Sequence, residues 1–129
     1  MLTNINKPKL KKILSPQPLI VKSYNNFSRA MYYALLGIVT EVISDREKEK
    51  KQQLLLNPNG KIMSEKLDDA KIAKDIYDKI GRLYPESTFN VVVLNLVGGE
   101  YQYAYSKENT AYLAVATGNR VFTIFKYKD

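Results

Sequence analysis

The stretch from Ala111 to Phe125 reads AYLAVATGNRVFTIF, and its pattern decides the fold. Two runs rich in β-branched, aromatic and small apolar residues flank Gly118-Asn119, which is a two-residue turn signal. Glycine adopts a positive φ without steric cost, so this dipeptide suits a tight hairpin. The stretch therefore predicts two antiparallel strands, Ala111–Ala116 and Val121–Phe125, joined by a short turn.

The segment before this hairpin predicts two more strands. Phe89–Val97 is dense in valine and leucine, and Gly98-Gly99 follows it. Strict alternation of apolar and small or polar residues then indicates a strand whose two faces differ. The two glycines are typical of a hairpin turn, which would pair Val91–Val97 with Tyr101–Tyr105. The alternating residues are Tyr101, Gln102, Tyr103, Ala104 and Tyr105.

Two helices are expected upstream. The first is capped by Asn25 or Ser28 and runs to about Asp45, or continues through the charged residues to Lys51. Leu54-Leu55-Leu56 either completes its apolar stripe or docks on a partner, and Asn57 to Gly60 forms a turn. Its apolar stripe comprises Phe27, Met31, Ala34, Leu35, Ile38 and Val42.

The second helix is expected from about Ser64 to Pro85, where proline stops it. One face carries Ile72, Ala73, Ile76, Ile80 and Leu83, and the lysine-rich remainder predicts that Asp68, Asp69, Asp75 and Asp78 face solvent. Gly81 costs a helix about 1 kcal/mol relative to alanine. It therefore indicates either close packing or the end of the helix.

Together these elements predict an α+β fold. A short strand at Leu19–Val21 precedes two helices that pack on a four- to five-stranded antiparallel sheet. Residues 1–18 form an extended basic arm, residues 19–129 form one domain, and residues 46–66 make a long helix-to-helix connection. No apolar run approaches the roughly 20 residues of a membrane span, and no secretory signal is expected.

The net charge of +7 is unevenly distributed. Residues 1–40 contain six basic residues and no acid, whereas the remainder is nearly neutral. The basic end is therefore either a solvated tail or a segment that docks on an acidic partner such as a microtubule surface. The six basic residues are Lys7, Lys9, Lys11, Lys12, Lys22 and Arg29.

The chain contains neither cysteine nor histidine. These absences exclude disulfides, thiolate metal sites, and the commonest nucleophile and general base. No pair of carboxylates, lysines or tyrosines stands out by its spacing. We therefore expect no enzyme activity, no cofactor and no metal site.

Three pieces of the sequence, in this order and spacing, resemble the small dimeric dynein light chains that bind peptides. The first is a short strand leading into a long helix. The second is a helix followed by tyrosine, proline and a bulky aromatic residue, and the third is a glycine followed by an apolar run ending in Phe-Lys. In this chain they are Leu19–Ser23, Ile72–Phe89 and Gly118–Lys126.

The resemblance implies a dimer in which one strand crosses to the sheet of the partner protomer. The outer edge of that strand then takes up an extended segment of another protein by main-chain hydrogen bonding. The implied partner-binding residues are Tyr101, Gln102, Tyr103, Ala104, Tyr105, Leu113 and Val115. The implied dimer interface comprises Ile76, Lys79, Ile80, Tyr101, Tyr103 and Tyr105.

The resemblance also implies partners and a location. The partners would be a dynein intermediate chain and a second light chain, identical or related, within a dynein complex on microtubules. The location would be the cytoplasm and cytoskeleton, and in particular the axoneme of a cilium. No membrane is expected as a partner.

The sequence departs from the family in its basic arm, its long helix-to-helix connection and the absence of histidine from the groove strand. Other interpretations therefore stay open. The chain could be a light chain of the Tctex or roadblock type. Alternatively, its tyrosines and phenylalanines could form a stacking platform for nucleic acid. The near-neutral balance after residue 40 disfavours nucleic acid as a partner.

Overall fold

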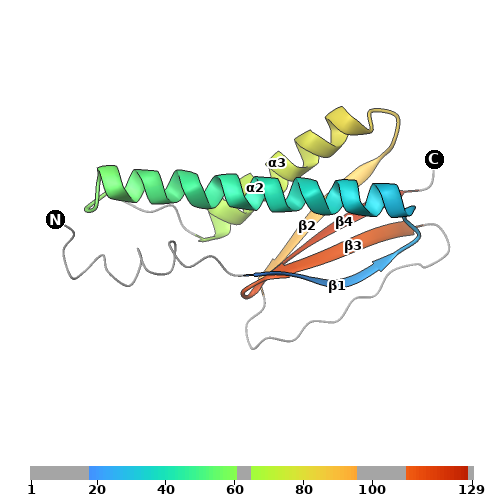
Figure 1. Cartoon of the computed structure of the whole chain (residues 1–129), viewed down its shortest axis with the longest axis horizontal. Helices are drawn as coiled ribbons and strands as arrows, with labels where there is room; N and C mark the ends of the chain where they lie inside the picture. The colour runs from blue at the N-terminus through green and yellow to red at the C-terminus, as the bar shows by residue number, and fades with distance from the viewer. Residues whose placement is uncertain (1–17, 61–64, 96–109, 128–129) are drawn as a thin grey trace.

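The computed structural model describes residues 18–60, 65–95 and 110–127 (Figure 1). The described residues form an α+β fold, as the sequence predicts. Two helices are followed by three of the four strands of one antiparallel sheet. In chain order the elements are β1 (Leu19–Asn25), α2 (Arg29–Leu56), α3 (Glu65–Leu83), β2 (Phe89–Asn95), β3 (Thr110–Thr117) and β4 (Arg120–Tyr127).

The hairpin of β3 and β4 forms the centre of the sheet, whose strand order is β1-β3-β4-β2. Val115 lies opposite Phe122 and Leu113 lies opposite Ile124 across the hairpin. Gly118 adopts a φ of 59° at the first turn position, where L side chains are disfavoured. The hairpin predicted from Gly118-Asn119 is therefore confirmed.

The core lies between the sheet and the two helices, which cover the same face (Figure 1). Strand residues point alternately to the two faces of a sheet, so every second residue of β3 and β4 meets the helices. The fully buried side chains of this core include Leu35 and Val39 of α2, Ile72, Ile76 and Ile80 of α3, Leu113 and Val115 of β3, and Phe122 and Ile124 of β4.

Helix α2 is longer than the sequence predicts. It begins after Ser28, whose Oγ accepts a hydrogen bond from the backbone N–H of Met31 at 3.1 Å. It runs for 28 residues, about 42 Å, and extends past the sheet (Figure 1). The expected connection over residues 46–66 is thus wrong, because residues 46–56 are helical. Leu54 is buried, as predicted for the stripe, whereas Leu56 is 87% exposed.

Two predicted segments lie outside the described residues, namely residues 1–17 of the basic arm and the tyrosine strand from Tyr101 to Tyr105. Within the part of the chain that the structure describes, no helix is both long and apolar enough to cross a membrane.

The core position of Ile76 leads to a stability prediction. Ile76→Ala removes a fully buried side chain between α3 and the sheet, so we expect the free energy of unfolding to fall by about 2–5 kcal/mol. Urea denaturation followed by circular dichroism measures this change. The control Leu56→Ala removes an exposed leucine and should change stability by less than about 0.5 kcal/mol. Equal effects of the two substitutions would contradict the described core.

Candidate functional site

The described sheet has two edge strands, β1 and β2, and β1 is protected against pairing with another chain. Its register shifts between Val21 and Ser23, so Lys22 forms a bulge. Lys22 is exposed on this strand. A bulge and a lysine are two devices by which proteins prevent a sheet edge from accepting a further strand.

Strand β2 has neither device. Its sequence, FNVVVLN, contains no charge, and its pairing with β4 is continuous from Phe89 opposite Lys126 to Asn95 opposite Arg120. No described strand lies on its other side. An uncharged, regular edge of seven residues is a template for pairing with another chain. This edge is the candidate site.

The hydrogen-bonding direction of each β2 residue follows from one contact. The N–H of Tyr127 donates to the carbonyl of Thr88 at 3.0 Å, in register with the β2–β4 ladder. In antiparallel pairs, residues that bond to the neighbour alternate with residues that point away from it. Asn90 and Val92 therefore bond to β4, whereas Val91 and Val93 present their N–H and C=O groups to the open edge.

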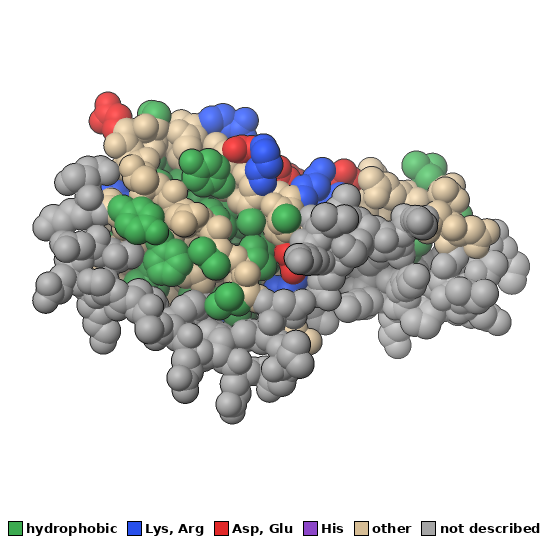
Figure 2. Space-filling model, turned by 180° about the vertical axis from the view of Figure 1, so that it is seen from behind, with side chains coloured by type: hydrophobic (Ala, Val, Ile, Leu, Met, Phe, Trp, Pro, Cys, Tyr) green, Lys and Arg blue, Asp and Glu red, His purple; other side chains and the backbone are tan. Residues whose placement is uncertain are grey.

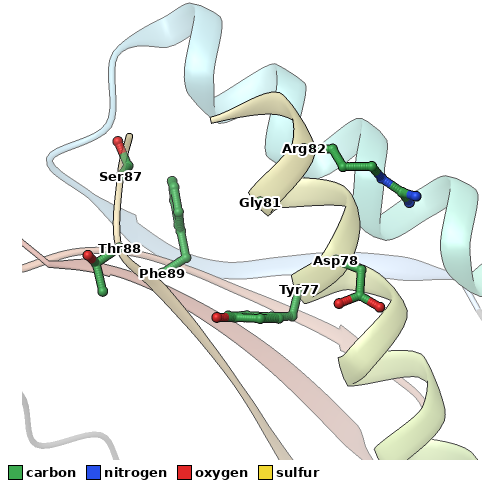
Figure 3. Close-up of a pocket in the computed structure, with 7 residues that line it drawn as sticks. All are labelled: Tyr77, Asp78, Gly81, Arg82, Ser87, Thr88 and Phe89. Carbon is green, nitrogen blue, oxygen red and sulfur yellow. The ribbon is translucent and has the colours of Figure 1, made fainter. Parts of the chain in front are cut away.

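A groove with a volume of about 480 Å³ lies between the last turns of α3 and the beginning of β2. The ring of Tyr77 reaches from α3 toward the strand, and Phe89 stands opposite Gly81, whereas Asp78 and Arg82 point away (Figure 3). Tyr84 packs beside Phe89, with ring centroids 5.9 Å apart. The groove therefore offers two aromatic rings next to the open edge, and its two charged lining residues, Asp78 and Arg82, turn their side chains outward.

Exposed apolar side chains lie near β2 on both faces of the sheet. Figure 2 views the molecule from behind α2, and hydrophobic side chains gather in its left half beneath a row of charged ones. Tyr77 is 52% exposed, and Val92, on the sheet face turned away from the helices, is 37% exposed. Such exposed apolar side chains beside an open sheet edge favour a protein partner.

The structure changes the predicted list of site residues. Ile76 and Ile80 are fully buried in the core, so they cannot contact a second chain. Leu113 and Val115 are also fully buried, and β3 pairs with β1 and β4 on its two edges. These four assignments are corrected, because the side chains serve the internal core. Tyr101, Gln102, Tyr103, Ala104 and Tyr105 lie outside the described residues.

Lys79 lies at the surface between the helices, where its Nζ donates to Glu41 Oε1 of α2 at 2.7 Å. This hydrogen bond and the positive charge of Lys79 lower the pKa of Glu41 below its ordinary value of 4.5. Lys79 therefore has a partner within its own chain, and its predicted place in a dimer interface stays a prediction.

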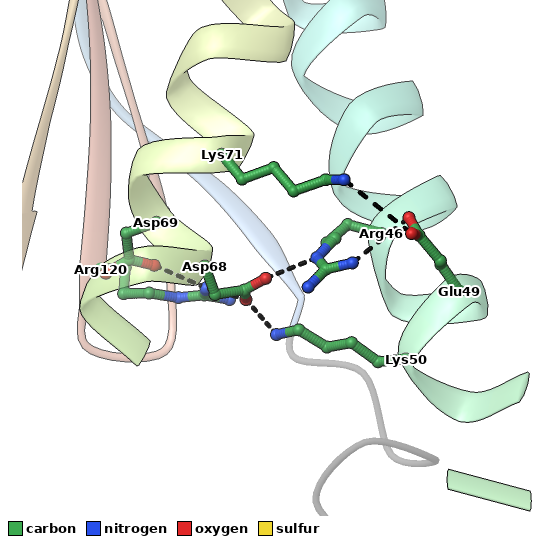
Figure 4. A network of polar contacts seen from close by, with 7 residues as sticks. All are labelled: Arg46, Glu49, Lys50, Asp68, Asp69, Lys71 and Arg120. Atoms are coloured by element: carbon green, nitrogen blue, oxygen red, sulfur yellow. Dashed lines mark hydrogen bonds and ion pairs between the residues drawn. The ribbon is translucent and has the colours of Figure 1, made fainter. Parts of the chain in front are cut away.

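An ion network at the other end of α3 was missed by the sequence analysis (Figure 4). The carboxylate of Asp68 is fully buried and accepts a hydrogen bond from Arg46 Nε at 2.5 Å. It also pairs with Lys50 and lies 3.6 Å from Arg120 Nη1 of β4. The expectation that Asp68 faces solvent is wrong, because three cations compensate for its burial.

The network extends to Asp69, which is also buried although it was expected to face solvent, and to the exposed Glu49. Arg120 Nη1 donates to Asp69 Oδ1 at 2.8 Å, and Arg46 pairs with Glu49 at 3.3 Å. Burial alone would lower the pKa of Arg46, but Asp68 and Glu49 raise it overall. The spacing of Arg46 and Lys50, one helical turn apart, was the available signal. This spacing alone could not show that the two cations pair with Asp68 on another helix.

The chemistry of the candidate site is that of backbone recognition. Among residues 18–60, 65–95 and 110–127, no group of three or more potential metal-ligating side chains occurs. The β2 edge offers alternating donors and acceptors, and the groove offers space for side chains.

No family model and no curated protein matches this sequence. The assignment of a function therefore rests on the geometry of the site and on the physical character of the residues around it.

The ion network leads to a second stability prediction. Asp68→Ala leaves three cations without their buried counter-charge, so we expect a loss of about 3–5 kcal/mol in the free energy of unfolding. Chemical denaturation measures it. The matched control Asp78→Ala removes an exposed i,i+4 partner of Lys74 and should cost less than about 0.5 kcal/mol. A loss below 1 kcal/mol for Asp68→Ala would contradict the network.

The contact between Glu41 and Lys79 leads to a pH prediction. Lys79→Gln should raise the pKa of Glu41 toward 4.5, because the favourable charge is removed. Since the folded-state pKa is lowered, the stabilisation is complete above pH 4.5 and is lost as the pH falls through the folded-state pKa. An NMR titration of the Glu41 carboxyl measures the shift. Lys74→Gln, a change elsewhere on α3, should leave the pKa of Glu41 where it is.

Proposed function

We propose that this protein is a non-catalytic assembly subunit that dimerises and binds extended segments of other proteins by β-strand addition. The observation that supports this proposal is the uncharged, regular and open edge of β2, which borders a groove under α3. The protected edge of β1 directs the addition to β2.

Strand addition explains how such a site binds without catalytic groups. An added strand forms main-chain hydrogen bonds with the outward groups of Phe89, Val91, Val93 and Asn95, and these bonds depend little on sequence. Side-chain pockets must therefore supply the selectivity. A single site of micromolar affinity corresponds to about −8 kcal/mol, and a dimer that holds two linked segments gains further by effective concentration.

The resemblance to dynein light chains makes the proposal more specific. In that family a strand from one protomer completes the sheet of the other, and the partner segment adds outside it. By that likeness, the strand added to β2 would be the tyrosine strand of a second copy, and the segment of another protein would add to the outer edge of that tyrosine strand. The chain would then belong to a dynein complex on microtubules, in the cytoskeleton or an axoneme, with intermediate chains or other light chains as partners.

Two proline substitutions test the β2 edge, because the N–H groups that they remove point to opposite sides of the strand. Val91→Pro removes an N–H that faces the open edge, so it should keep the fold and abolish dimerisation in sedimentation experiments. Val92→Pro removes an N–H that faces β4, so it should disrupt the sheet and lower the melting temperature sharply.

The wild-type chain should sediment as a dimer and bind N-terminal peptides of dynein intermediate chains. A strict monomer that binds none of these peptides would overturn the proposal. Salt-dependent retention on single-stranded oligonucleotides would instead support the nucleic-acid alternative.

A further inference from the structure

Gly81 is costly where it stands and has no packing role within the described chain. It lies inside α3, two residues before its end, where glycine is less favourable than alanine. A Cβ built at this position meets no atom within 4 Å. The expectation that Gly81 permits close packing within the chain is therefore not met, whereas its place in the last turn, two residues before Leu83, agrees with the alternative that the helix is ending.

Gly81 instead keeps the groove open. It lines the space between α3 and β2, with Tyr77 one turn earlier on the helix and Phe89 across from it (Figure 3). Phe89 is 7% exposed and is held by Tyr84, so it forms a fixed wall. Tyr77 is half-exposed and forms the outer wall. The bare backbone of Gly81 is the floor of a slot between two rings.

The chemistry of this slot suits an aromatic side chain. Two rings on its walls favour an aromatic side chain by offset or edge-to-face contact. The charged groups of Asp78 and Arg82 point away from the slot, and the hydroxyl groups of Ser87 and Thr88 point away from α3 (Figure 3). The slot lies along the edge on which an added strand would run, so every second side chain of that strand faces α3.

We propose that this slot seats a tyrosine of the added strand on Gly81, between Tyr77 and Phe89, and that the strand is the Tyr101–Tyr105 segment of a second copy of this chain. The inference rests on the proposed function. The chain itself supplies the required pattern, since tyrosine occupies every second position of that segment. Gly81 thus makes the helix of one protomer less stable and leaves space for a side chain of the other protomer.

Alanine substitution separates stability from association. Gly81→Ala should raise the melting temperature by about 2–6 °C, because alanine favours the helix. It should also weaken dimerisation at least about 10-fold, because its methyl group enters the slot. Gly81→Leu should weaken it further. The dimer dissociation constant is measured by sedimentation over a concentration series, and thermal unfolding gives the melting temperature.

Gly37→Ala is the matched control. Gly37 is likewise a helical glycine whose added Cβ meets nothing within 4 Å, but it lies on α2 outside the groove. Its substitution should raise the melting temperature by a similar amount and leave the dimer dissociation constant unchanged. A higher melting temperature with weaker dimerisation for Gly81→Ala, together with unchanged dimerisation for Gly37→Ala, would support the slot.

Substitution of the three tyrosines tests which segment occupies the slot. Joint replacement of Tyr101, Tyr103 and Tyr105 by phenylalanine should keep the dimer, and joint replacement by alanine should dissociate it. If both the alanine triple variant and Gly81→Ala dimerised like the wild type, the slot proposal would be overturned. Loss of the dimer in Val91→Pro would even then support dimerisation through the β2 edge. A wild-type monomer would overturn both proposals.

Discussion

The structure depends on one constraint of sheets, which is that the backbone polar groups along every strand need a partner. The β3–β4 hairpin satisfies it for the centre of the sheet, because β1 pairs with β3 and β2 pairs with β4. The two outer edges are treated differently. A bulge and Lys22 discourage pairing at β1, whereas β2 presents the outward groups of Val91 and Val93 without a charge or an irregularity.

Stability and recognition are placed at different parts of the molecule. The buried network around Asp68 ties α2, the beginning of α3 and β4 together. The groove lies near the opposite end of α3, where Gly81 and Tyr77 face the start of β2. Because α3 belongs to both, one helix links the part that holds the fold together to the part that we propose for binding. A helix anchored by buried charges can accommodate an unfavourable glycine.

The site could be located from the sequence only in part. The apolar positions of α3 were identifiable by their spacing, but Ile76 and Ile80 were assigned to an interface although they fill the core. Periodicity shows that a face is apolar, and it does not show whether the covering layer comes from the same chain. The burial of Leu113 and Val115 was misjudged for the same reason, since their place in the sheet depends on strand order.

The sequence by itself determined the elements: the hairpin at Gly118-Asn119, the two helices and the α+β class follow from local spacing and turn chemistry. Tertiary structure alone decided which described strand lies at the edge, that Asp68 is buried among three cations, and that Gly81 lines a groove. The physical reason is that local patterns act over a few residues. Edges, ion networks and grooves arise between segments that are tens of residues apart, and their partners are set by packing.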